Sequence, residues 1–232
     1  MPGVSIPLFS QKCWSFTLRR HEEYKRKINQ ILLLSENDPN FRLSKKDNPD
    51  EAVSLIDHTQ TNVYAWKSNW RLHEHFTIFN ELCEDLKPCF TQIIKEEKIK
   101  DTSEIEAVDC WVNQYKKGDY TVSHAHEPNG WMAVYFMNIP KDTKSVFRVF
   151  NPLGTTYNSE LPENCNALDV KAKEGSILIM SGSILHEATT NTSDETRITV
   201  PMNFRIYEKF LPKIKNSETN NTVSVQESHD PI

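Results

Sequence analysis

The chain has 232 residues, 38% of them hydrophobic and 10% aromatic, a composition typical of a globular protein with a substantial core. Its net charge of -5 argues against a general basic surface for DNA or RNA. No apolar stretch is long enough to span a bilayer, no signal sequence is recognisable, and the five cysteines include no CxxC pair. We therefore expect a soluble, cytoplasmic protein without a zinc ribbon or a disulfide framework.

The first hundred or so residues are predicted to be mostly helical. Apolar residues recur close to helical spacing across 16–34 and again across 75–99. Pro88 lies inside the second run and should kink or split that helix. The segment 37–57 is rich in Asp, Asn, Pro and Ser, which predicts a loop or an irregular connection.

Near Glu104 the pattern changes to short strands separated by turn signals. We predict strands at 105–115, 120–126, 131–137, 145–150, 168–170, 176–180, 185–188 and 197–206. Short antiparallel strands after a helical segment indicate a mainly β fold with helices, arranged as a β-sandwich or jelly roll. We expect a single domain over 1–212, with helical support from 1–103, a β core over 104–207 and a disordered tail over 213–232.

The last predicted strand has two chemically different faces. One set of alternate residues is apolar: Ile198, Val200, Met202, Phe204 and Ile206. The intervening set, apart from Pro201, is polar: Arg197, Thr199, Asn203 and Arg205. Alternation places the two sets on opposite faces of the sheet. The apolar face should pack on the N-terminal helices, and the polar face should line either solvent or the mouth of the sandwich.

Three histidines form a candidate metal site. His124 and His126 lie two residues apart at the end of a predicted strand, so both imidazoles can converge on one point. His186 follows at another strand-like segment, and three neutral imidazoles are good ligands for a first-row metal. An HxH pair by itself is weak evidence, and in an arbitrary chain it favours two surface or partly buried histidines over a metal site.

The order of motifs around these histidines resembles that of the Fe(II)- and 2-oxoglutarate-dependent oxygenases. These enzymes share a strand, an HxD or related pair, a distant histidine and then an Arg or Lys on the last core strand. The resemblance is strongest to a branch with an HxH pair and covers most of 6–206. The matching segments are 6–9, 62–68, 111–113, 124–126, 134–136, 150–152, 174–179 and 197–204. It implies a double-stranded β-helix, or jelly roll, flanked by the N-terminal helices.

The resemblance also implies a function. The protein would be a 2-oxoglutarate-dependent dioxygenase that oxidises an unidentified substrate while O2 and 2-oxoglutarate are converted to succinate and CO2. Its Fe(II) would be held by His124, His126 and His186.

The distal carboxylate of 2-oxoglutarate needs a fixed cation, and Arg197 is the expected partner because a planar guanidinium can form a bidentate pair. Further cosubstrate contacts are expected from Thr199, Asn113, Tyr115 and Asn203. Two alternatives stay open: Arg197 could form an ordinary ion pair with Asp194 or Glu195, or Arg205 could bind the carboxylate instead.

The sequence departs from the usual oxygenase site at His126, which stands where the facial triad has a carboxylate. His126 could ligate iron itself, Glu127 or Asp119 could supply a carboxylate from a neighbouring turn, or His126 could lie behind the ligands. We favour the first interpretation. It would add positive charge to the site and alter its iron affinity or redox tuning.

Two other functions remain open. A cupin-type metal dioxygenase with three histidines and no cosubstrate would explain the missing carboxylate, and a non-catalytic jelly-roll module would leave the histidines without a role. The substrate is expected to be a small molecule or a side chain. The net charge disfavours nucleic acid without excluding it, no membrane partner is expected, and a homodimer is compatible with the sequence.

Overall fold

The computed structural model describes residues 12–37, 42–45, 48–54, 62–99, 103–126, 130–151 and 167–208. The predicted tail, the motif at 6–9 and Glu127 lie outside the described residues.

The described residues form helices and strands in the following order. The helices are α1 (His21–Asn37), α2 (Leu72–His75) and α3 (Thr77–Glu96). The strands before the predicted β core are β1 (Cys13–Thr17), β2 (Arg42–Lys45), β3 (Asn48–Ser54), β4 (Val63–Tyr64) and β5 (Trp66–Lys67). Those within it are β6 (Ser103–Cys110), β7 (Asn113–Tyr115), β8 (Tyr120–His124), β9 (Trp131–Asn138), β10 (Phe147–Phe150), β11 (Ala167–Val170), β12 (Ser176–Ser181), β13 (His186–Ala188) and β14 (Arg197–Glu208).

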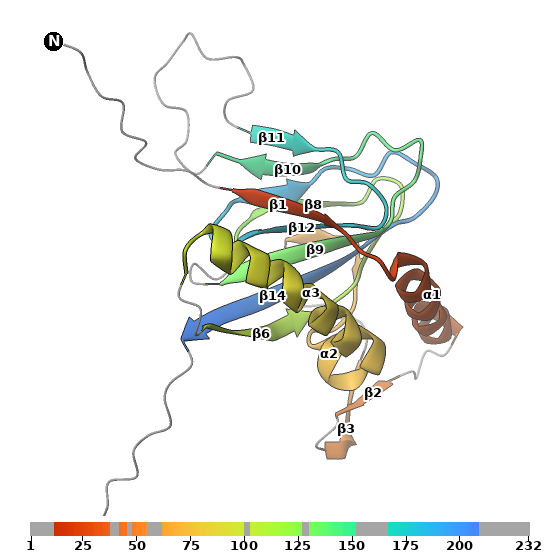
Figure 1. The fold of residues 1–232 in the computed structure, drawn as a ribbon. Coiled ribbons are helices and arrows are strands. Elements are labelled where there is room, and N and C mark those ends of the chain that lie inside the picture. The colour runs from red at the N-terminus through yellow and green to blue at the C-terminus, as the bar shows by residue number, and fades with distance from the viewer. Residues whose placement is uncertain are drawn as a thin grey trace, which may run out of the picture.

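Two antiparallel sheets form the body of the molecule. The larger sheet has the order β1-β12-β9-β14-β7-β5, with β6 also paired to β14, and the smaller has the order β11-β10-β13-β8-β4. A separate hairpin joins β2 to β3. Helix α3 crosses the outer face of the larger sheet, with α1 beside it (Figure 1). The predicted mainly β architecture with helical support is therefore confirmed.

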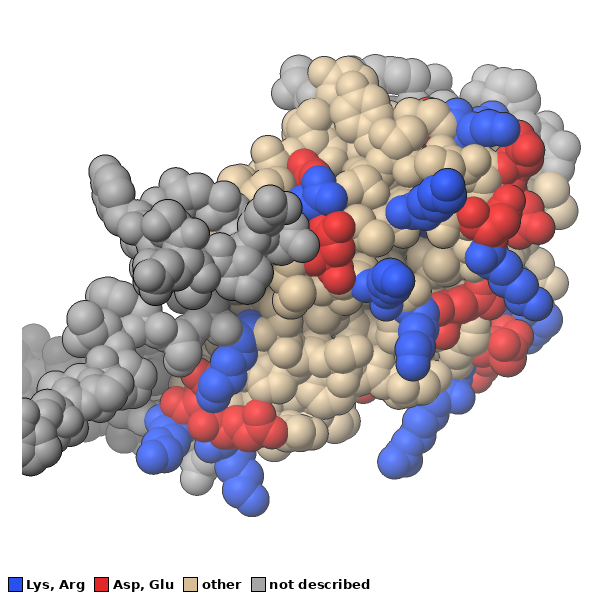
Figure 2. Space-filling view, turned by 90° about the horizontal axis from the view of Figure 1, so that it is seen from above, with Lys and Arg blue, Asp and Glu red and all other residues tan. Residues whose placement is uncertain are grey.

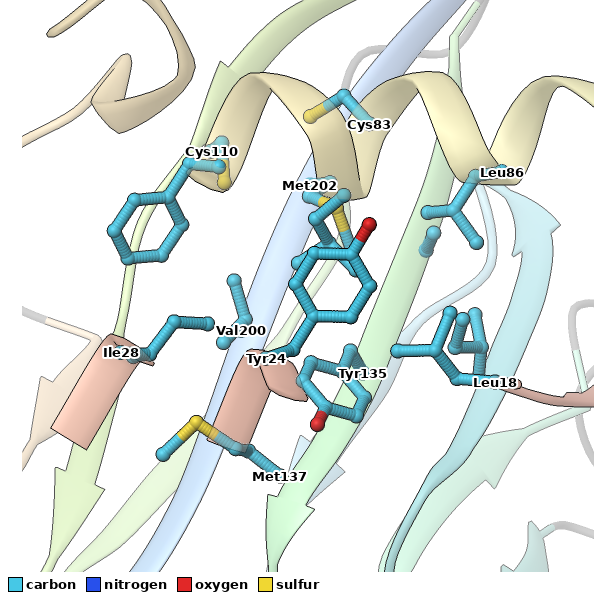
Figure 3. Close-up of a cluster of buried hydrophobic side chains, with 14 of the residues drawn as sticks. Leu18, Tyr24, Ile28, Cys83, Leu86, Cys110, Tyr135, Met137, Val200 and Met202 are labelled. Carbon is cyan, nitrogen blue, oxygen red and sulfur yellow. The ribbon is translucent and has the colours of Figure 1, made fainter. Parts of the chain in front are cut away.

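Alternation along the central strands separates two cores. From β9, Ala133, Tyr135 and Met137 pack with the helices, whereas Met132, Val134 and Phe136 join a second cluster between the sheets. Figure 3 shows the helix-side cluster, where Tyr24 and Ile28 of α1 and Leu86 of α3 meet Val200 and Met202 of β14. The alternation predicted for 197–206 is thus confirmed, and the apolar face packs on the helices.

The structure corrects three local predictions. Phe16 belongs to a strand, because Cys13–Thr17 pairs with β12 before α1 begins at His21. Part of the expected loop 37–57 is the β2–β3 hairpin. Pro88 does not split the second helix, which runs from Thr77 to Glu96, since Pro88 sits on an exposed position between buried Leu86 and Phe90.

The predicted strand at 105–115 is two strands. β6 and β7 are separated by Trp111 and Val112, and both pair with β14. The backbone of this junction is held by Trp111 N–H donating to Pro201 O (3.1 Å) and Ser68 N–H donating to Val112 O (2.9 Å).

Charges of both signs are mixed on one face of the molecule. Figure 2 shows Lys and Arg interspersed with Asp and Glu on the face that it views. Within the described ranges, no helix has the length and apolar character needed to cross a membrane.

Candidate metal centre

A cavity of about 190 Å³ lies between the two sheets. Its walls come from β7, β9 and β14 of the larger sheet and from β8, β10 and β13 of the smaller one. The side chains that line it include the three histidines, Arg197, Thr199, Asn113, Tyr115 and Asn203. The polar face of β14 therefore lines the inside of the sandwich, one of the two positions predicted for it.

The smaller sheet brings the three histidines together. His124 ends β8 and is the register partner of His186 at the start of β13. His126 follows β8, and its backbone N–H donates to Gly182 O (2.7 Å) in the turn before β13. One ligand atom from each imidazole can be chosen so that all three lie within 4.8 Å of one another. The described residues add no carboxylate to this group.

Each imidazole uses Nδ1 for a hydrogen bond to an oxygen that can only accept. Nδ1 of His124 lies 2.9 Å from Val122 O, and Nδ1 of His186 lies 2.8 Å from Ile184 O. Nδ1 of His126 lies 2.5 Å from Oδ1 of Asn203. Because each Nδ1 must donate, the lone pair of each neutral ring is on Nε2, the tautomer that binds a metal through Nε2.

Burial keeps these imidazoles neutral. It lowers the pKa of His186 to about 3 and the pKa of His126 to about 4, and it also lowers the pKa of His124. Neutral imidazoles with a directed lone pair suit a first-row metal ion, so the donor set fits Fe(II).

Arg197 lies in the same cavity and has no acidic partner among the described residues. Its side chain is 2% exposed, Nη1 donates to Oγ of Ser145, and Nε has no hydrogen-bond partner among the described residues. Burial lowers the pKa of Arg197, and its guanidinium carbon lies 5.2 Å from the centre of the Tyr115 ring. A buried cation in this state fits an anionic ligand, because burying an isolated charge is unfavourable.

The alternatives for Arg197 do not match these contacts. Asp194 pairs instead with Nζ of Lys117 at 2.9 Å, and no ion pair joins Arg197 to Glu195 within the described part of the chain. Arg205 does not line the cavity.

The other predicted cosubstrate residues divide into two groups. Thr199 is the register partner of Asn113, and Arg197 is the partner of Tyr115, so these four side chains lie at one end of the cavity. Nδ2 of Asn113 donates to the Tyr115 hydroxyl (3.2 Å), which contacts Thr121 Oγ1 (2.9 Å).

Asn203 lies elsewhere, beside His126, and its Nδ2 donates to Oδ2 of Asp109 (3.1 Å). Among the proposed carboxylates, Asp119 caps its own turn by accepting from Lys116 N–H (2.8 Å) and does not line the cavity.

Sequence reasoning did not assign roles to several residues at this site. Trp111 stacks on His126 with ring centres 5.9 Å apart, and Trp70 packs against Trp111 at 4.5 Å. The position of Trp111 at the site could have been predicted, because Trp111 was expected to share a strand face with Asn113. Ser145 lies in a loop, and no sequence pattern indicated its contact with Arg197.

Part of the chain is similar to a known protein family. Residues 109–203 match the family described as "Putative 2OG-Fe(II) oxygenase". No curated protein sequence is significantly similar to the chain.

Solved structures share the fold at low sequence identity. A prolyl-4-hydroxylase from Pseudomonas putida superposes with a TM-score of 0.57 at 12% identity, over 84% of this chain and 93% of that one. HygX from Streptomyces hygroscopicus, with nickel, 2-oxoglutarate and hygromycin B bound, gives a TM-score of 0.57 at 8% identity, over 84% and 83% of the two chains. At such identities these likenesses establish the fold, and the predicted jelly roll is confirmed.

The matched segment 109–203 contains His124, His126, His186 and Arg197, so the candidate site lies in the part of the chain that is similar to this family.

Proposed function

We propose that Nε2 atoms of His124, His126 and His186 bind Fe(II), and that Arg197 binds the distal carboxylate of 2-oxoglutarate. The observation that carries this proposal is the shared use of Nδ1: all three rings donate through it, which leaves all three Nε2 lone pairs for one ion. The described residues add no carboxylate to the group, which favours His126 as the third ligand.

Bound Fe(II) supplies the redox chemistry that couples O2 and 2-oxoglutarate to substrate oxidation. The protein residues hold and shield the reactants. His124 and His186 are fixed by backbone carbonyls two residues earlier in the chain, so the rigid smaller sheet sets their positions. Phe147 stacks on His186 with ring centres 5.2 Å apart and keeps water from that side of the site.

Arg197 defines the anion-binding end of the cavity. Its guanidinium is held on one side by Ser145 and lies near the Tyr115 ring, which leaves Nε for a carboxylate oxygen. Thr199 and Asn113 lie one strand step away, and Oδ1 of Asn113 has no partner among the described residues. We assign these residues to positioning the cosubstrate.

We assign the substrate entrance to the more exposed part of the cavity lining. Asn62, Val63, Trp70 and Ala125 line the cavity and are more exposed than Arg197, Thr199 and Asn113. A small molecule or a protruding side chain can reach the metal position through this mouth, where the Trp70 and Trp111 indoles offer an apolar wall.

The three-histidine ligand set also favours a second candidate, a cupin-type dioxygenase that uses no cosubstrate. The two candidates differ at Arg197, because the charge of this buried guanidinium has no acidic partner among the described residues and would be compensated by a bound carboxylate.

The test is anaerobic addition of Fe(II) and then 2-oxoglutarate to the metal-free protein. We expect a metal-to-ligand absorption band with the native protein and succinate release once O2 is admitted. Arg197→Met should abolish the band at matched 2-oxoglutarate, whereas Arg148→Met should retain it, because Arg148 pairs with Asp169 and Glu187 outside the cavity. A band that is unchanged in Arg197→Met would exclude this role for Arg197 and leave the cupin-type candidate.

We further propose a cytoplasmic location and a single domain over 1–212. Cys13, Cys83, Cys89 and Cys110 are free thiols, as is common in a reducing compartment. Packing of α1 and α3 on the larger sheet supports the single domain. Nucleic acid remains a disfavoured substrate class, and a homodimer remains compatible with the chain.

A further inference from the structure

We propose that Asn203 and Asp109 are positioning residues for His126, with the Asp109 carboxylate fixing the Asn203 amide so that Nε2 of His126 faces the metal. This inference rests on the proposed function, in which His126 is a metal ligand. It gives the chain a carboxylate that acts from behind the third histidine.

The three histidines are not anchored in the same way. His124 and His186 donate to backbone oxygens only two residues away, Val122 O and Ile184 O. His126 instead contacts a side chain of the other sheet, Asn203 of β14, at 2.5 Å. The orientation of His126 therefore depends on one replaceable amide, whereas the orientation of the other two follows from the backbone.

An amide can present either an acceptor or a donor to a neighbouring imidazole. If Oδ1 of Asn203 faces Nδ1 of His126, the ring proton is on Nδ1 and the Nε2 lone pair is available. If the amide were rotated by half a turn, Nδ2 would donate to Nδ1, and the proton of a neutral ring would move to Nε2. That second tautomer cannot bind a metal through Nε2.

Asp109 selects the first arrangement. Its Oδ2 accepts from Nδ2 of Asn203 at 3.1 Å, and a rotated amide would place Oδ1 against this carboxylate. The pair is built into the sheet, since Asn203 and Asp109 are register partners on β14 and β6.

Two neighbours hold the rest of this arrangement. The Trp111 indole stacks on the His126 ring, with ring planes 24° apart, and restricts its tilt. Nε of Arg71 lies 3.9 Å from Oδ1 of Asp109, the carboxylate oxygen other than the one that accepts from Asn203. The hydrogen-bond chain thus runs from His126 through Asn203 to a carboxylate outside the cavity.

The test is Ni(II) affinity of the metal-free full chain, measured by calorimetry without substrate or turnover. Asn203→Ala should raise the Ni(II) Kd about 10- to 100-fold, the usual cost of losing a partner behind a histidine ligand. Asp109→Ala should raise it by a smaller factor, since the amide keeps its position but loses its orientation. Asn138→Ala is the matched control, because Nδ2 of Asn138 in β9 donates to Thr196 O and the residue does not line the cavity.

An exchange variant separates positioning from folding. Asn203→Asp combined with Asp109→Asn keeps one amide and one carboxylate in the pair and still gives Nδ1 of His126 an acceptor. We expect it to bring the Kd back to within about threefold of the native value.

The inference is overturned if Asn203→Ala binds Ni(II) within about twofold of native while His124→Ala abolishes binding. It is equally overturned, together with the three-histidine assignment, if His126→Ala leaves the affinity unchanged. Native affinity in both His124→Ala and His186→Ala would instead reject the proposed function itself.

Discussion

Alternate residues of β14 lie in two different environments, an apolar core on one face of the strand and a cavity with polar walls on the other. Ile198, Val200 and Met202 point toward the helices and are packed among apolar side chains. Arg197 and Thr199, on the other face, are equally buried but line the cavity between the sheets. The strand therefore separates the helix-side core, which stabilises the fold, from the cavity, which holds the candidate site.

The two sides of the strand also differ in whether their polar groups have hydrogen-bond partners. On the helix side, the Tyr24 hydroxyl donates to Asp85 at 2.6 Å and also lies 3.0 Å from Nη1 of Arg20. On the cavity side, Nε of Arg197, Oδ1 of Asn113 and Nε1 of Trp111 have no hydrogen-bond partner among the described residues. Buried polar atoms are normally satisfied, so the three atoms at this cavity are candidates for contacts with a bound ligand.

The largest expected effect on stability comes from the helix side. Phe90 of α3 is fully buried and packs on Phe204 of β14, with ring centres 4.5 Å apart. Phe90→Ala should lower the free energy of unfolding by about 3 to 5 kcal/mol, because it removes apolar contact and leaves a cavity. Urea unfolding of the metal-free protein measures this loss.

The control for Phe90 is Gln92→Ala on the exposed side of the same helix, where only a side-chain hydrogen bond to Glu96 is lost. It should change the free energy of unfolding by less than about 0.5 kcal/mol. If Phe90→Ala is equally mild, the helix does not supply the stability assigned to it. The Ni(II) affinity of folded Phe90→Ala should remain native.

On the cavity side we expect a smaller change in the free energy of unfolding, and one that stabilises the ligand-free protein. Arg197→Met should raise the free energy of unfolding of the ligand-free protein by about 1 to 3 kcal/mol, because it removes a buried charge without an acidic partner. The same variant should lose 2-oxoglutarate binding. Thermal unfolding with and without 2-oxoglutarate and Ni(II) gives both values in one experiment.

Arg148→Met provides the comparison, since Arg148 is more exposed and already paired with Asp169 and Glu187. It should lower the free energy of unfolding by no more than about 1 kcal/mol and leave ligand binding intact. A clear loss of stability in Arg197→Met would mean that this guanidinium holds the two sheets together instead of awaiting an anion.

Local periodicity predicted which face of β14 packs on the helices, and the order of the motifs pointed to residues that the structure brings together in one cavity. The alternation in β14 identified which face meets the helices, and the spacing of His124 and His126 identified side chains that converge. Strand β1 was missed because Phe16 also fits the helical period that continues into α1. The β2–β3 hairpin was missed because its sequence has the composition of a loop.

Partners distant in sequence could not be predicted in the same way. Asn203 and Asp109 lie 94 residues apart, and only the pairing of β14 with β6 makes them neighbours. Sequence placed Asn203 with Arg197 because both share the polar face of one strand. Their separation along that strand puts Asn203 at the other end of the cavity, beside His126.

The smallest expected difference between the two regions concerns the stability lost when one of two glycines is replaced by alanine. Gly175 precedes β12 on the helix side and Gly118 lies in the β7–β8 turn on the cavity side, with φ of +80° and +93°. Alanine at either position should cost about 1 to 2 kcal/mol for the left-handed backbone alone.

At Gly175 the added Cβ would also lie 3.0 Å from Cγ of His21, whereas at Gly118 no described atom lies within 4 Å. Gly175→Ala should therefore be the more destabilising of the two in urea unfolding, because His21 at the start of α1 contacts the Tyr135 hydroxyl and cannot move freely. Equal losses would show that His21 can shift away from this turn, and that α1 docks on the larger sheet less tightly than its buried residues indicate.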